Sequence, residues 1–283
     1  MIWNYHYTIV NMKKALIGIS NKIKEHKSKI KVWSESFRKF SNDDIILLVA
    51  NPDEEDLRIC DELNLKYHVV DVGDPWYINN KRLYHTAEYL KYSDIDVFLV
   101  TDVFDVLFQS NPFDKFDLET YDLFVSGEGI YLREEPWNTD VINKCFPGEI
   151  ECCINNEIIC SGVIGGKRVP LIKLFERMHN MCENALNNHN VRDQAALILM
   201  IAKNEVENLK IFNLNDGWTM HCATSGPTQF FEGWGFKRNL EGRYSIPKLE
   251  NNRICTDDGR TIDIVHQFNR VPEWHKIITS DYE

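Results

Sequence analysis

The stretch from Val97 to Val106 (VFLVTDVFDV) constrains the fold and the chemistry of this chain most strongly. Its first four residues are apolar, and a short apolar run bounded by polar residues is typical of a strand buried on both faces of a parallel sheet. Asp102 and Asp105 follow this run, and ligand sites in open α/β sheets lie just beyond the carboxyl ends of such strands. Two carboxylates there favour a hard divalent cation, which prefers oxygen ligands and often binds substrate phosphates. The stretch therefore predicts a metal-dependent enzyme that acts on a phosphorylated donor.

Two acids at a strand end could instead cap the next segment or face water. Here apolar residues flank them on both sides, at 97–100 and 106–108. The acids are therefore expected within buried chain, where an uncompensated charge is costly. We expect a metal ion or another cationic partner at Asp102 and Asp105.

Apolar runs alternate with helical patterns through the first half of the chain. We expect strands at residues 15–20, 45–50 and 67–72 and one that ends at Asp102, with helices at 22–40, 54–63 and 80–91. Strands that alternate with helices of this length form βαβ units, which build a mostly parallel sheet. The sequence therefore predicts an α/β fold, a single Rossmann-like domain over residues 1–283 with helices flanking the central sheet. The half over about residues 15–125 has the architecture of a nucleotide-binding unit, but it lacks both GxGxxG and GxxxxGKS/T, which disfavours a dinucleotide oxidoreductase or a P-loop kinase.

The second half of the chain is less regular. We expect a strand at 123–126 that runs into Gly127-Glu128-Gly129, and a strand-like segment at 160–166. Helices are expected at 170–184 and 193–203, a long ordered loop at 216–252, and a final strand at 261–268. No repeat or linker divides the chain, so one domain is expected.

Composition disfavours several classes of protein. The net charge of −11 argues against general nucleic-acid binding, which needs a basic face. The chain contains no apolar window of about 18 residues, so no membrane span is expected. The first residues lack the basic and apolar regions of a signal peptide. A cytoplasmic protein is therefore expected, with its eight cysteines reduced. A disulfide or metal knot among the cysteines between Cys145 and Cys160 is the alternative.

His266 is a further candidate ligand. Alternation along 262–266 (IDIVH) places it on the same face as Ile262 and Ile264. An inward-pointing histidine is commonly a hydrogen-bonded core residue, but a neutral imidazole also suits manganese and other transition metals. Both interpretations stay open from the residues alone.

Four segments together resemble the nucleotide-sugar glycosyltransferases of the GT-A fold. Residues 101–106 (TDVFDV) resemble their metal-binding motif, in the D-x-x-D form of the glycosyltransferase domains of procollagen lysyl hydroxylases and of related microbial and viral enzymes. Residues 265–274 (VHQFNRVPEW) are similar to the H-F-x-G-x-x-K-P-W signature of glycogenin-like transferases, without its glycine. Residues 160–165 (CSGVIG) resemble the N-S-G-x-x-x-G acceptor-side strand, and Asp193-Gln194 matches the D-Q pair of the helix that follows it. The resemblance covers about residues 15–275 and makes about 126–275 the acceptor-side half.

This resemblance implies a set of roles for individual residues. Asp102, Asp105 and His266 would hold Mn²⁺ or Mg²⁺, and Phe104 would stack on the uracil ring of a UDP-sugar. The remaining implied contacts are to the donor diphosphate, at Lys81 or Arg82 and at Arg270, and to the acceptor side, at Ser161, Gly162 and Gln194.

Sugar transfer also needs a carboxylate within hydrogen-bond reach of the acceptor hydroxyl. Asp193 is the first candidate, and a role as the N-cap of its helix is the alternative. Glu128, between two glycines, is a second candidate. Trp218 and Trp234 lie in an aromatic, glycine-rich stretch that could cover the acceptor or simply pack its loop.

The sequence thus predicts a metal-dependent glycosyltransferase that moves a sugar from a UDP-sugar to a hydroxyl of a glycan or protein. A metal-dependent phosphohydrolase or nucleotidyltransferase could use the same acids on another phosphate. A carbohydrate-binding module with an inactive site is the non-enzymatic alternative.

Overall fold

The computed structural model describes residues 12–74, 78–189, 191–226, 244 and 247–282. Their central feature is a seven-stranded sheet with the strand order β3-β2-β1-β4-β7-β6-β8. The strands are β1 (Lys14–Ser20), β2 (Asp44–Ala50), β3 (Lys66–Val70), β4 (Val97–Thr101), β6 (Leu123–Tyr131), β7 (Glu157–Lys167) and β8 (Leu209–Phe212). All neighbouring pairs are parallel except those of β7, which runs antiparallel to β4 and β6. The predicted α/β fold with a mostly parallel central sheet is confirmed.

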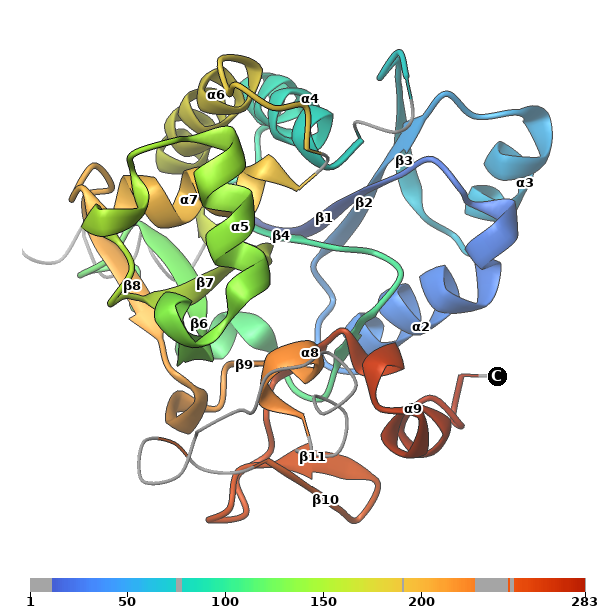
Figure 1. Ribbon diagram of the computed structural model, residues 1–283. Coiled ribbons are helices and arrows are strands. Elements are labelled where there is room, and N and C mark those ends of the chain that lie inside the picture. The colour runs from blue at the N-terminus through green and yellow to red at the C-terminus, as the bar shows by residue number, and fades with distance from the viewer. Residues whose placement is uncertain (1–11, 75–77, 190, 227–243, 245–246, 283) are drawn as a thin grey trace, which may run out of the picture.

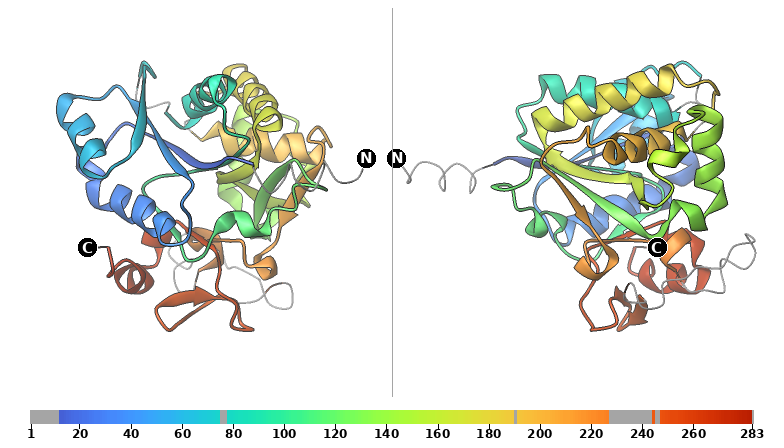
Figure 2. Two further views of the ribbon diagram at one scale, coloured as in Figure 1. Left: turned by 180° about the vertical axis from the view of Figure 1, so that it is seen from behind. Right: turned by 60° about the vertical axis from the view of Figure 1, so that its left-hand side comes forward.

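Helices cover both faces of this sheet, as Figures 1 and 2 show. On one face lie α4 (Ile78–Tyr92), α6 (Arg168–Glu183) and α7 (Arg192–Ala202), with α5 (Pro136–Cys145) packed on α7. On the other face lie α2 (Lys27–Arg38) and α3 (Glu54–Glu62). Within β2, Ile46 and Leu48 pack toward the first group and Leu47 and Val49 toward the second. Burial on both faces explains why the strand is a continuous apolar run.

The sheet contains a switch point between β1 and β4. From β1 the chain adds β2 and β3 on one side, and it then returns through α4 to place β4 on the other side. The carboxyl ends of β1 and β4 therefore diverge and leave a crevice, which is the usual ligand position in such sheets. The centre of the antiparallel strand β7 lies beside the carboxyl end of β4, where the Asp102 backbone N–H donates to Gly162 O at 2.9 Å.

A small second sheet closes this end of the molecule. It consists of β5 (Val106–Phe108), β12 (Ile264–His266) and β9 (Thr219–His221), in the order β5-β12-β9. Its register pairs His266 with Val106 on one side and with His221 on the other. Three chain segments far apart in sequence are thereby joined. In Figure 1 the ribbon of β10 (Lys248–Glu250) and β11 (Arg253–Cys255) lies below β9, while the helices α8 (Cys222–Ser225) and α9 (Pro272–Ile278) lie to the right of β9.

The structure corrects several predicted boundaries. The helix expected at 22–40 begins at Lys27, after a 3₁₀ turn over Lys24–His26. The strand expected at 123–126 continues through two register shifts to Tyr131, so Glu128 lies within a strand rather than after it. The final strand at 261–268 is only the three residues of β12. The described part of the expected loop at 216–252 contains β9, α8 and β10.

Candidate functional site

Asp102, Asp105 and His266 meet at the carboxyl end of β4. Asp102 ends the buried strand, Asp105 lies in the short turn before β5, and β12 carries His266 alongside β5. His266 Nε2 lies 3.2 Å from Asp102 Oδ2 and 3.8 Å from Asp105 Oδ1, and the potential ligand atoms all lie within 4.8 Å of one another. Two atoms bonded at about 2.0–2.2 Å to one metal ion lie at most about 4.4 Å apart, which is close to the spacing of these ligand atoms. We call these three residues the hard group.

Opposing electrostatic effects act on the two acids of the hard group. Burial alone would raise the pKa of the Asp102 carboxyl, but the charge of Arg82 and the hydrogen bond from His266 hold that pKa well below its usual value. Burial raises the pKa of the Asp105 carboxyl, because the positive charge of His266 offsets it only in part. The hard group therefore has one permanent carboxylate and one acid that a cation would help to ionise.

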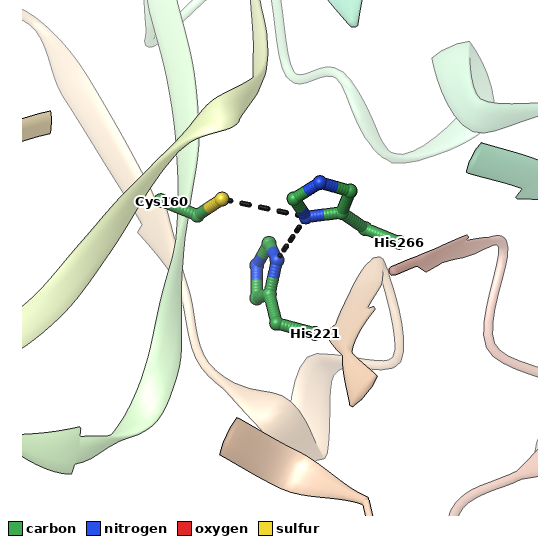
Figure 3. A group of neighbouring side chains, drawn as sticks. All are labelled: Cys160, His221 and His266. Carbon is green, nitrogen blue, oxygen red and sulfur yellow. Dashed lines mark hydrogen bonds between the residues drawn. The ribbon is translucent and has the colours of Figure 1, made fainter. Parts of the chain in front are cut away.

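The other side of the His266 ring faces a second group of ligand-type side chains (Figure 3). His266 Nδ1 lies 2.9 Å from His221 Nδ1 and 3.5 Å from Cys160 Sγ. His221 Nε2 in turn lies 2.7 Å from Ser126 Oγ. Burial lowers the pKa of His221 well below its ordinary value, with the neighbouring charge of His266 adding to the effect. We call Cys160, His221 and His266 the soft group.

Arg82 on α4 connects Asp102 to Asp193. Its guanidinium pairs with Asp102 and, through Nη2, with Asp193 Oδ2 at 2.5 Å. Nη2 also donates to Ser161 O and Oγ at 3.0 and 3.1 Å. Asp193 lies in the first turn of α7, but the N-cap is Val191 and no side chain caps this helix. The carboxylate of Asp193 is therefore used in the ion pair and not as a helix cap.

Two cavities open beside these groups. The larger, of about 420 Å³, is lined by both candidate bases, Glu128 and Asp193, and by further predicted site residues, namely Arg82, Asp102, Ser161, Gly162, Gln194, His266 and Arg270. The smaller, of about 170 Å³, lies at the crevice between β1 and β4 and is lined by Phe104, Asp102, Asp105 and Arg82. Asp102 and Arg82 line both cavities, so the predicted donor and acceptor residues lie around two neighbouring cavities.

Glu128 has the environment of a group that exchanges a proton near neutral pH. It is 5 % exposed, and burial raises the pKa of its carboxyl to about 7, although a hydrogen bond with Thr224 opposes the shift. A catalytic acid or base works best when its pKa lies near the operating pH. Position in the cavity and pKa together make Glu128 a stronger candidate than the sequence suggested.

Three predicted site residues lie elsewhere or cannot be placed. Trp218 is fully buried, and its Nε1–H donates to Pro112 O at 3.0 Å, which favours the packing alternative over a sugar-binding one. Lys81 Nζ lies 3.7 Å from Glu183, and Lys81 does not line either of the two cavities described above. Trp234 lies outside the described residues.

Sequence reasoning missed His221 and Trp137, and it considered Cys160 as a metal ligand only together with its neighbouring cysteines, not with histidines. Trp137, on α5, lines the larger cavity and is 45 % exposed. His221 belongs to a strand of three residues, which is too short to show alternation. All eight cysteines are free, as expected, and within the described chain only Cys160 among them joins a group of potential metal ligands.

No protein-family model matches the chain, and no curated protein matches it. Fold and site together define an α/β protein with a large, mostly parallel sheet and two adjoining groups of side chains that could hold a metal ion. None of the helices in the described residues is long and apolar enough to span a bilayer.

Proposed function

We propose that this chain is a GT-A-like glycosyltransferase that moves a sugar from a UDP-sugar to a hydroxyl of a glycan or protein with the help of Mn²⁺ or Mg²⁺. The observation that carries the proposal is the convergence of Asp102, Asp105 and His266 beside the crevice between β1 and β4. Nucleotides bind at this crevice in open α/β sheets. A metal group at that place, next to a larger cavity with two buried acids, suits transfer of a group from a nucleoside diphosphate.

The ligand atoms of the hard group fit the proposed cation. Two carboxylates and one imidazole suit Mn²⁺, while Mg²⁺ prefers oxygen ligands alone. When bound, the cation would act as a Lewis acid that stabilises the charge of the departing diphosphate. Arg82 and Arg270 line the same cavity and would add fixed positive charge beside it. Phe104, which lines the smaller cavity, would stack on the base.

Glu128 and Asp193 take different parts in this proposal. Glu128, with its pKa of about 7, would accept the proton of the acceptor hydroxyl as a general base. Asp193 already neutralises Arg82, so it would hold this arginine toward the diphosphate and accept a hydrogen bond from the sugar. Ser161 Oγ, 3.2 Å from Asp193 Oδ2, would offer a further polar contact to the sugar.

The decisive experiment measures release of UDP from a panel of UDP-sugars with Mn²⁺, in the presence and absence of glycan and peptide acceptors. Turnover in the wild type should depend on both metal and acceptor. Asp105→Ala should reduce it by at least about 100-fold, because a metal ion supplies several kcal/mol of transition-state stabilisation. Asp61→Ala, which removes an equally charged, exposed residue from α3, is the matched control and should retain full turnover.

Other outcomes identify the alternatives. UDP release that needs metal but not acceptor would indicate a phosphohydrolase. Sugar binding without metal-dependent UDP binding would indicate a carbohydrate-binding module. Metal-dependent turnover that is equal in Asp105→Ala and the wild type would exclude the hard group as the metal site.

A further inference from the structure

The soft group is buried on the side of the His266 ring that faces away from the two aspartates. Figure 3 shows Cys160 from one strand and the two imidazoles from two others pointing toward a common centre. Cys160 and His266 are each 2 % exposed and His221 is fully buried. Three ligand-type side chains thus converge where the fold would otherwise place apolar ones.

The spacing of the three ligand atoms is close to that of a bound zinc ion. Bonds of about 2.3 Å to sulfur and 2.0–2.1 Å to nitrogen, at tetrahedral angles, place ligand atoms roughly 3.3–3.6 Å apart. The S–N distance is 3.5 Å and the N–N distance is 2.9 Å. The two imidazoles would need to separate by a few tenths of an ångström, and all three ligand atoms lie within 4.8 Å of one another.

The far side of each ring also has the partner that metal-binding histidines require. Such histidines almost always hydrogen-bond through their second ring nitrogen, often to a carboxylate. His266 Nε2 lies 3.2 Å from Asp102 Oδ2, and His221 Nε2 lies 2.7 Å from Ser126 Oγ. The Gly162 backbone N–H donates to Cys160 Sγ at 3.2 Å, which would stabilise a thiolate. Cys160 and His266 line the 420 Å³ cavity, so an ion has a route to the group and room for a fourth ligand.

We propose that Cys160, His221 and His266 form a second metal site, for a thiophilic divalent cation such as Zn²⁺ or Co²⁺. Sulfur and imidazole ligands select these metals over Mn²⁺ and Mg²⁺. Binding forms one S–metal and two N–metal bonds, and it releases to solvent the thiol proton and the proton shared by the two Nδ1 atoms. The Nε2–H of His266 then donates a hydrogen bond to Asp102, so Nε2 can no longer serve as a ligand of the hard group. Zn²⁺ at the soft group therefore excludes Mn²⁺ from the hard group, a consequence that rests on the proposed function.

Cobalt reports on the site directly, because a thiolate bound to Co²⁺ gives a charge-transfer absorption band in the near ultraviolet. The wild-type protein should show this band at one equivalent of Co²⁺. Cys160→Ser, nearly equal in shape, should lose the band and bind Zn²⁺ more than about 100-fold more weakly, beyond the range for loss of an outer-shell partner. Cys152→Ser removes an exposed thiol outside the group and should keep the band. Absence of the band in the wild type, or its persistence in folded Cys160→Ser, would overturn the proposal.

Two further measurements separate this site from the proposed manganese site. Asp105→Asn removes a ligand of the hard group alone, so the cobalt–thiolate band should remain. A band that needs Asp105 would place the ion in the hard group and refute a separate site. The paramagnetic resonance signal of free Mn²⁺ measures the competition between Zn²⁺ and Mn²⁺. Displacing half of the bound Mn²⁺ should take at least about tenfold more Zn²⁺ in Cys160→Ser than in the wild type. A cobalt–thiolate band without any Mn²⁺ binding would refute the proposed function and leave the soft site standing.

Discussion

Alanine at Gly162 should destroy the hard group while leaving the fold intact. Gly162 lies in β7 with ordinary strand backbone, so alanine is compatible with its conformation. A Cβ at this position would lie 2.8 Å from Asp102 Oδ2, 2.8 Å from His266 Nε2 and 2.6 Å from His266 Cε1. The methyl group would therefore fill the space between two of the proposed metal ligands.

The size of the effect follows from these distances. Ordinary contacts of carbon lie at about 3.5 Å, so both ligand atoms must move by roughly 0.7 Å. Metal sites tolerate changes of only about 0.2 Å in their bond lengths. We expect Mn²⁺ affinity to fall by at least about tenfold, or roughly 1.4 kcal/mol. The free energy of unfolding should fall by only about 1–3 kcal/mol from overpacking, less the 0.4–1 kcal/mol gained by replacing glycine.

Titration calorimetry with Mn²⁺ and UDP, together with urea unfolding, measures both effects. Gly165→Ala is the matched control, because it lies on the same strand and its Cβ would overlap Phe116 instead of a ligand. This control should lose stability but keep its affinity for Mn²⁺. If Gly162→Ala binds Mn²⁺ within twofold of the wild type, the ion does not bind between Asp102 and His266, and the reasoning fails.

Four further predictions concern charge, protonation and a buried hydrogen bond. Arg82→Met should cost about 3–5 kcal/mol in urea unfolding, because both carboxylate partners of Arg82 lose their counter-charge; a loss below about 1 kcal/mol would contradict this. Turnover should rise with pH through about 7 as Glu128 loses its proton, and a pH–rate profile of Glu128→Gln should lack this rise. In the folded state Glu128 keeps its proton above pH 4.5, the ordinary pKa of a glutamate, so the free energy of unfolding should fall between pH 4.5 and about 7. Unfolding at several pH values should show a smaller fall in Glu128→Gln than in the wild type. Thr101→Val leaves the buried Trp33 Nε1–H without its acceptor at 2.8 Å and should lower the free energy of unfolding by about 1–3 kcal/mol, whereas an unchanged value would mean that water replaces the hydroxyl.

The strands and helices of the first half were predictable because a buried face appears in the sequence as a local pattern of apolar residues. The apolar runs expected at 15–20 and 45–50 agree with β1 and β2 to within one residue. The helix expected at 54–63 is α3, whose N-cap Asp53 forms a capping box with Asp56. Elements of three residues, such as β5 and β9, show no recognisable pattern, since they are too short to show a period.

By itself the sequence determined that Asp102 and Asp105 end a buried strand and that His266 points inward. The sequence could not determine which side chains contact Nδ1 of His266 or which acids form ion pairs with Arg82. Those contacts exist because β12 pairs with both β5 and β9, and because α4 and α7 meet over β7, across separations of 45 to 160 residues. A local pattern records which face of an element is buried, but it carries no information about the partner. The tertiary structure alone therefore brought His221 and Cys160 to His266, and Asp193 to Arg82.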